Sequence, residues 1–228
     1  MDFLLQGFFE AIRLLFTGNP ETYSAIGATL QASGYSMVFS LMVGIPTGFC
    51  LGYFQFPGKQ GVRTVVDTLM ALPTVFIGLL VYAFLTRRGP LGELGLLFTL
   101  PGIAIGQAIL ALPIVIGLCA TAIEGMDKKL RIALLSMGAD RRQLFLSSLW
   151  ETRRGILAAG VAAYGRVMTE VGISMMVGGN IKYHTRTITT AIALETGKGM
   201  FATGIALGIV LLLIAFAVTL PASLLRRR

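Results

Sequence analysis

The sequence predicts an all-α fold, a polytopic membrane helix bundle with about five transmembrane helices and an N-terminal interfacial helix. The mean hydropathy is +0.78, and charged residues make up only 13% of the chain, whereas soluble domains carry about 25%. Three stretches, residues 22–58, 94–123 and 199–225, contain no charged residue. Each exceeds the roughly 20 residues that a helix needs to cross a bilayer. A chain of 228 residues holds one such bundle and no second large domain.

The first segment, residues 3–17, is too short to span a bilayer comfortably, and we expect it to lie in the membrane interface. Its polar side chains share the spacing of one helix face: Asp2, Gln6, Glu10, Arg13 and Thr17. Gly18-Asn19-Pro20 then ends the helix. These observations divide the chain into an interfacial amphipathic helix, residues 1–20, and a transmembrane domain, residues 21–228.

The spanning helices follow from the apolar stretches and the residues that interrupt them. We expect them at about residues 23–53, 65–85, 101–123, 156–177 and 201–225. Pro73 and Pro113 fall inside the second and third helices and act as hinges or as simple kinks. A short re-entrant piece is possible before the third helix. Residues 185–196 predict a short amphipathic helix outside the membrane, where it packs on the outer mouth of the bundle.

The distribution of Lys and Arg predicts an outer N-terminus and a cytoplasmic C-terminus in the cell inner membrane. With this orientation, twelve Lys and Arg residues lie in cytoplasmic segments and six lie outside. The pair Arg87-Arg88 is the local exception. The net charge of +8 is explained by these loops, and no separate basic domain points to nucleic acid.

Metal chemistry has little support in the sequence. Cys50 and Cys119 both lie in apolar stretches and predict buried thiols. His184 is the only histidine, and we interpret it as a polar surface residue of an outer loop. No Gly-x-x-x-x-Gly-Lys-Ser/Thr phosphate loop occurs, so we expect no cofactor on this chain.

The most informative segment is the polar loop of residues 124–154. Leu130, Ala133, Leu134 and Met137 have the spacing of one apolar helix face. Gly138 suits a helix C-terminus, and Asp140 with Gln143 suits the cap of a next helix. The loop therefore predicts two short helices joined at a glycine corner. Such helices lie on the membrane, pack on their own bundle, or dock into a groove on a partner.

This loop resembles the signature loop of importer permeases that work with ATP-binding-cassette subunits. The segment Ala133-Leu134-Leu135-Ser136-Met137-Gly138-Ala139-Asp140-Arg141 carries the likeness through Ala133 and Gly138. Ile132 stands where the signature has Glu, and Leu134 stands where it has a second Ala. The positions of its later Ile-x-Leu-Pro read Ser148-Leu149-Trp150-Glu151.

The region 168–199 resembles tungstate-type permeases, and molybdate and sulfate permeases share a looser version of it. The likeness rests on Glu170-Val171-Gly172, Gly178-Gly179-Asn180, Thr185-Arg186-Thr187-Ile188-Thr189-Thr190-Ala191-Ile192 and Leu194-Glu195-Thr196-Gly197. The resemblance implies the type I (MetI-like) permease fold and an importer of an oxyanion, first tungstate, with molybdate or sulfate as the alternative. It also implies a homodimer, cytoplasmic ATPase subunits that hold ATP and Mg, and an outer substrate-binding protein. The ATPase-coupling residues would be Ala133, Leu134, Met137, Gly138, Ala139, Asp140 and Arg141.

Candidate pathway residues come from the fourth helix and its neighbours. Arg166 and Glu170 are four apart and share a helix face. They are part of a gate, or they are a neutralised structural pair, in which case swapping their charges should retain transport. Neutral donors are sufficient to hold an oxyanion, although a hydroxyl in a helix commonly bonds its own helix carbonyl. The neutral candidates are Thr29, Ser33, Thr169, Ser174 and Asn180.

Two other classes of protein compete with a permease subunit. A secondary transporter of a small anion would need ionisable residues deep in several helices, and only the fourth helix has them. A membrane enzyme would need a convergent set of His, Cys, Asp or Glu, which the sequence does not offer. We therefore expect no catalytic activity on this chain.

Overall fold

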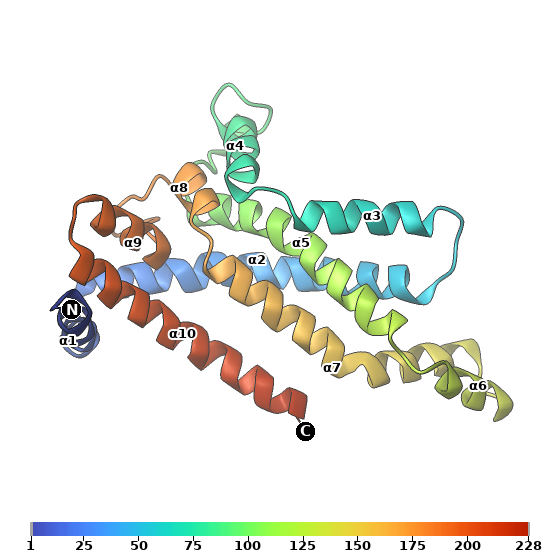
Figure 1. The fold of residues 1–228 in the computed structure, drawn as a ribbon. Coiled ribbons are helices and arrows are strands. Elements are labelled where there is room, and N and C mark those ends of the chain that lie inside the picture. The colour runs from blue at the N-terminus through green and yellow to red at the C-terminus, as the bar shows by residue number, and fades with distance from the viewer. Residues whose placement is uncertain (1, 228) are drawn as a thin grey trace.

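The computed structural model describes residues 2–227, and within this range it contains helices and no β-strand (Figure 1). The side chains of residues 2–3, 128, 130–131 and 222–227 lie outside the description, and they include Leu130 of the predicted apolar face. The predicted all-α fold is confirmed.

Three of the expected spans are single helices. They are α2 (Pro20–Tyr53), α5 (Leu100–Glu124) and α10 (Phe201–Arg227), and each is long and apolar enough to cross a membrane. The Asn19 side chain caps α2 by accepting from the backbone N–H groups of Glu21 and Thr22. Such caps satisfy N–H groups that a helix start leaves without partners.

The second span is broken, so the expected single helix over residues 65–85 is wrong. It consists of α3 (Lys59–Met70) and α4 (Thr74–Leu85), which meet at an angle of 93°. Pro73 lies at the break and precedes α4 rather than lying inside a helix. Proline lacks an N–H and crowds the preceding turn, which ends α3 here. Figure 1 shows α4 leaving the bundle sideways. The short helix η1 (Gly92–Leu94) follows before α5.

The fourth span begins earlier than expected and is broken near its end. The helix α7 (Arg141–Met168) runs without interruption through Glu151, Arg153 and Arg154, so the predicted second short helix and fourth span are one element. Charged residues are good helix formers, and their polarity does not end a helix. α7 then meets α8 (Gly172–Gly178) at 57°. We call residues 169–171 the α7–α8 junction.

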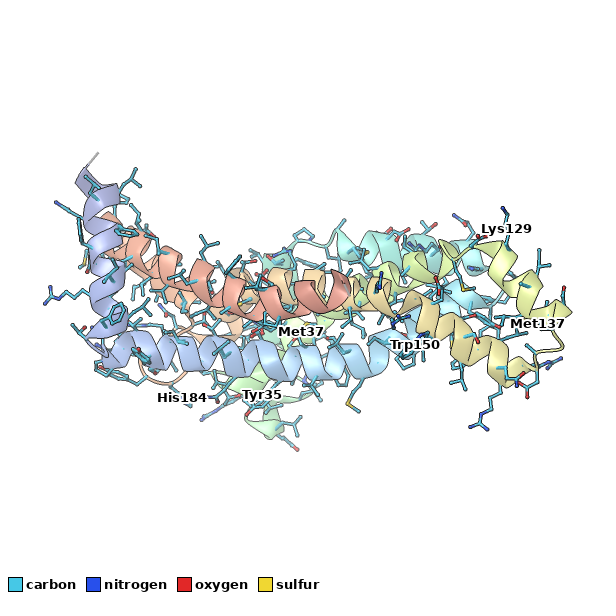
Figure 2. All side chains as sticks on the ribbon, turned by 90° about the horizontal axis from the view of Figure 1, so that it is seen from below. Tyr35, Met37, Lys129, Met137, Trp150 and His184 are labelled. Atoms are coloured by element: carbon cyan, nitrogen blue, oxygen red, sulfur yellow. The ribbon has the colours of Figure 1, made fainter. Side chains whose placement is uncertain are left out.

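The two ends of the bundle carry different elements (Figure 1). One end holds α1 (Asp2–Phe16), α9 (Ile188–Gly197) and the start of α10, and the opposite end holds α6 (Lys128–Ser136) and the first half of α7. We call residues 128–154 the elbow. Figure 2 shows Lys129 and Met137 of the elbow at the end of the molecule opposite to α1.

The N-terminal helix α1 crosses the direction of α2 and α10 steeply in Figure 2. It packs on α10, where a Cβ atom on Gly7 would approach the Ile205 Cγ2 atom to 2.7 Å. Ala11 is buried in the same contact, whereas several large apolar side chains of α1 are exposed, including Phe8, Phe9 and Phe16. This orientation is what an interfacial helix requires, and its place in the membrane interface stays a prediction.

Gly44, Gly48 and Gly52 lie on one face of α2 and form a close-packed seam with α5. A Cβ atom on Gly48 would lie 2.7 Å from the Ile116 carbonyl oxygen, and one on Gly52 would lie 2.7 Å from the Ala120 carbonyl oxygen. The seam continues into a core shared with α7, where Val115 and Ala163 are fully buried. Backbones approach this closely only where no side chain intervenes.

The α2–α5 seam predicts that Gly48→Ala destabilises the purified protein. The new methyl group meets backbone atoms that cannot move aside, and overpacking of this kind costs roughly 1–3 kcal/mol. Gly34→Ala in the same helix is the matched control, since a Cβ atom there meets nothing within 4 Å. Thermal unfolding in detergent compares the two variants, and equal midpoints would contradict the seam.

Candidate functional site

The charged pair expected in the fourth span forms in the structure. Arg166 Nη1 donates a hydrogen bond to Glu170 Oε2 at 3.1 Å. The two side chains differ in exposure, because Glu170 is 2% exposed and Arg166 is 46% exposed in the single chain. The carboxylate is thus fixed inside the protein while the guanidinium reaches its surface.

Glu170 also holds the α7–α8 junction together. Its Oε1 atom accepts hydrogen bonds from the backbone N–H groups of Gly172 at 2.8 Å and Ile173 at 3.3 Å. Its backbone carbonyl accepts from the hydroxyls of Thr189 at 3.0 Å and Ser174 at 3.3 Å. One residue therefore links α7, α8 and α9, a role that its spacing from Arg166 alone does not reveal.

The candidate hydroxyls are bonded locally. Thr29, Ser33, Thr169 and Ser174 each donate to the carbonyl four residues earlier in the chain. Thr29 in addition accepts from the backbone N–H of Ile188 at 2.9 Å, which anchors the start of α9 to α2. These hydroxyls were expected either to bind an oxyanion or to bond their own helix carbonyl, and the structure shows the bond to the carbonyl. That bond uses the hydroxyl proton that an oxyanion would need.

Asn180 lies apart from the junction, in the loop before α9. Its side-chain oxygen accepts from Arg186 Nε at 3.1 Å, and Arg186 forms an ion pair with Glu21 at the start of α2. Lys182 pairs with the same carboxylate at 2.7 Å. The hydrogen bond to Glu21 raises the pKa of the Lys182 ammonium. We call Glu21, Lys182 and Arg186 the Glu21 cluster. Sequence reasoning missed it because Glu21 is far along the chain from the other two residues.

A cavity of about 480 Å³ opens beside the Glu21 cluster, between α1, α2, α9 and α10. Its lining includes both acidic and basic side chains: Glu10, Glu21, Lys182, Arg186, Glu195 and Lys198. Glu195 and Lys198 pair at 2.8 Å. The helix α9 starts three residues later than expected and buries Thr189 and Thr190 with its apolar residues, so its inner face is more polar than the sequence suggests.

The elbow has the predicted glycine corner. Gly138 adopts a left-handed conformation with φ +79°, and Asp140 and Gln143 form a complete capping box at the start of α7. The predicted coupling residues Ala133 and Leu134 lie in α6, while Met137, Gly138, Ala139, Asp140 and Arg141 form the corner. The corner also exposes Met137 at 75%, and Ile132 in α6 is exposed at 63%.

Ion pairs join α3 to the end of α5 beside the elbow. Lys59 contacts Glu124 at 3.2 Å, and Arg63 contacts the same carboxylate at 3.9 Å. Arg63 also donates to the Thr121 hydroxyl at 2.6 Å. Within residues 2–227, the side chains that the structure describes include no group of three or more His, Cys, Asp and Glu able to hold a metal ion.

Residues 44–228 match the model of the family described as the binding-protein-dependent transport system inner membrane component. The chain is 48% identical over its full length to a tungstate uptake system permease protein of Campylobacter jejuni, of which it covers 95%. It is 38% identical to a probable anion ABC transporter permease protein of Haloferax volcanii, with 90% of both chains covered. It is 31% identical to the molybdenum transport system permease protein of Escherichia coli, over 76% of this chain and 79% of the relative.

Two solved structures share the fold. A chain of the inward-facing MetNI methionine ABC transporter superposes with a TM-score of 0.75 at 18% identity, covering 91% of this chain and 95% of the other. A chain of a bacterial ABC transporter that imports the polysaccharide alginate gives 0.74 at 22% identity, over 96% and 83%. At these identities the likeness establishes the fold, which is the expected MetI-like one.

The junction predicts that Glu170→Ala destabilises the protein more than Glu170→Gln. Alanine leaves the Gly172 and Ile173 N–H groups without an acceptor, which costs roughly 1–3 kcal/mol, whereas the glutamine oxygen can still accept. The charge swap is therefore expected to fail even if the pair is structural, because arginine at position 170 cannot accept these bonds. Thermal unfolding of the three variants is the measurement, and a fully stable swap would contradict the role of Glu170.

Proposed function

This chain belongs to the family of binding-protein-dependent transport system inner membrane components, and on that premise we propose that it is the permease subunit of an ATP-driven tungstate importer. The observation that carries the proposal is the full-length identity of 48% with a tungstate uptake permease. A second tungstate uptake permease, from Peptoclostridium acidaminophilum, is 35% identical over 96% of both chains.

Molybdate and sulfate are the alternative cargoes. The chain is 31% identical to molybdenum permeases and 26% identical to a sulfate permease, each over 76% of its length. Tungstate, molybdate and sulfate share a tetrahedral shape and two negative charges, so one passage suits all three. The proposal places most of the choice between them in the outer substrate-binding protein, which is a separate chain.

The elbow is the proposed docking site for a cytoplasmic ATPase subunit. Its exposed apolar side chains, among them Ile132, Leu135 and Met137, suit a groove on a partner. From Arg141 to Met168, α7 is one helix about 40 Å long, which would carry a movement of the elbow into the membrane. In this proposal ATP and Mg bind the ATPase, and this chain performs no chemistry.

We further propose that two copies of the chain form the passage between them and that the outer end meets the substrate-binding protein. The N-terminus then lies outside and the C-terminus in the cytoplasm, as the excess of Lys and Arg near the elbow favours. In this orientation the Glu21 cluster and the cavity beside α9 face the outside of the cell.

Transport by the reconstituted complex tests the proposed function. Proteoliposomes that hold the permease, its ATPase and the binding protein should take up tungstate only when ATP is supplied. Tungstate uptake should saturate at a lower concentration than molybdate or sulfate uptake. Uptake that follows an ion gradient without ATP would instead identify a secondary transporter.

The orientation is tested by thiol labelling in cells. In a Cys50→Ser background, Met137→Cys should be labelled by a membrane-impermeant maleimide only after the cells are opened. His184→Cys is the matched control, because it lies in the exposed loop before α9 and should be labelled in intact cells. Labelling of residue 137 in intact cells would show that the elbow lies outside, and it would contradict the proposed docking role.

A further inference from the structure

The only charged residues of the apolar stretch 156–178 are Arg166 and Glu170. The midpoint of the stretch is residue 167, so the pair lies near its centre. From Arg154, the last basic residue before the stretch, α7 rises about 18 Å to Arg166, and the hydrocarbon core is about 30 Å thick. The pair therefore lies at about the middle of the membrane.

A guanidinium at this depth cannot face lipid at an acceptable cost. The Arg166 side chain is nevertheless 46% exposed in the single chain. The exposed and half-exposed residues beside it on α7 are small: Ala158, Ala162, Gly165 and Thr169. The exposed face of α10 instead carries large apolar side chains such as Leu212, Leu213 and Phe216, which suit lipid. Arg166 therefore faces a space that protein or water fills, rather than lipid.

The guanidinium has donors to offer in that space. Of its five N–H groups, those that bond within the described part of the chain belong to the Nη1 atom, which donates to Glu170. The Glu170 carboxylate cannot move with a passing ligand, because its other oxygen accepts hydrogen bonds from the backbone N–H groups of Gly172 and Ile173. The planar fork of arginine matches the oxygens of an oxyanion. The adjacent carboxylate weakens the attraction, and a passage needs binding that is weak enough to release its cargo.

We propose that Arg166 is the mid-membrane contact for the cargo, donating hydrogen bonds to a tetrahedral dianion while Glu170 stays paired with it and permits release. This inference rests on the proposed function and adds the residue that meets the anion inside the membrane. It also assigns the exposed face of α7 around Arg166 to the passage.

The test uses the complete complex in proteoliposomes, with tungstate as the probe. Uptake and the ATP hydrolysis that the loaded binding protein stimulates are measured in parallel for Arg166→Gln, Arg166→Lys and the double variant Arg166→Gln with Glu170→Gln. Arg13→Gln in α1 is the matched control, because it removes one positive charge far from the passage. The dimeric state of each complex is measured by light scattering.

Arg166→Gln should lower tungstate uptake at limiting concentration by about tenfold or more, while stimulated ATP hydrolysis stays near the wild-type rate. Arg166→Lys should keep part of the uptake, because it keeps the charge and loses the fork. The double variant should stay defective although its two amides neutralise the pair, and Arg13→Gln should transport normally.

Recovery of uptake in the double variant would overturn the inference, since it would mean that the pair only needs to be neutral. Normal uptake by Arg166→Gln, or loss of dimers in both the single and the double variant, would overturn it as well. If the wild-type complex imports no oxyanion, the result contradicts the proposed function itself. The two failures are therefore distinguishable.

Discussion

The structure depends on one buried carboxylate at the α7–α8 junction. Glu170 accepts two backbone N–H groups of α8, pairs with Arg166 of α7, and accepts the Thr189 hydroxyl of α9 through its backbone carbonyl. Burying a carboxylate is costly unless it is paired and hydrogen-bonded, and these contacts meet that condition. They also fix the 57° bend between α7 and α8. The fourth span is thereby divided into α7 and α8, and the junction between them is tied to α9.

The same arrangement connects the two ends of the molecule. The helix α7 begins at the capped corner of the elbow and ends at the junction, while α9 is anchored to both Glu170 and Thr29. A displacement of the elbow would therefore reach α8 and α9 through the continuous helix α7 and the hydrogen bonds of the junction. Transporters of this kind move between packed arrangements rather than deforming continuously. The close glycine seam between α2 and α5 gives the bundle a firm body against which α7 can move.

The length of an apolar stretch was enough to predict the continuous spans. It did not predict the breaks between α3 and α4 and between α7 and α8, which depend on local geometry. Apolar length was sufficient for α2, α5 and α10, and Gly138 with Asp140 was sufficient for the corner of the elbow. Pro73 was expected to hinge or kink one helix, whereas the break and its size depend on how α4 packs against α8. The pairing of Arg166 with Glu170 follows from their spacing, whereas the capping of α8 and the Thr189 contact join residues whose proximity only the fold creates. For the same reason the Glu21 cluster could not be predicted from the sequence.

We propose that α7 transmits the work of the ATPase as a rigid helix from the elbow to the junction. Spin labels on its exposed residues Leu146 and Leu157 test it by electron–electron distance measurement in the complete complex, with and without bound nucleotide. A rigid α7 should keep the distance between Leu146 and Leu157 within one copy constant, while the distance between the two copies of residue 157 changes with nucleotide. A constant distance between the copies, together with a changing distance inside the helix, would contradict it.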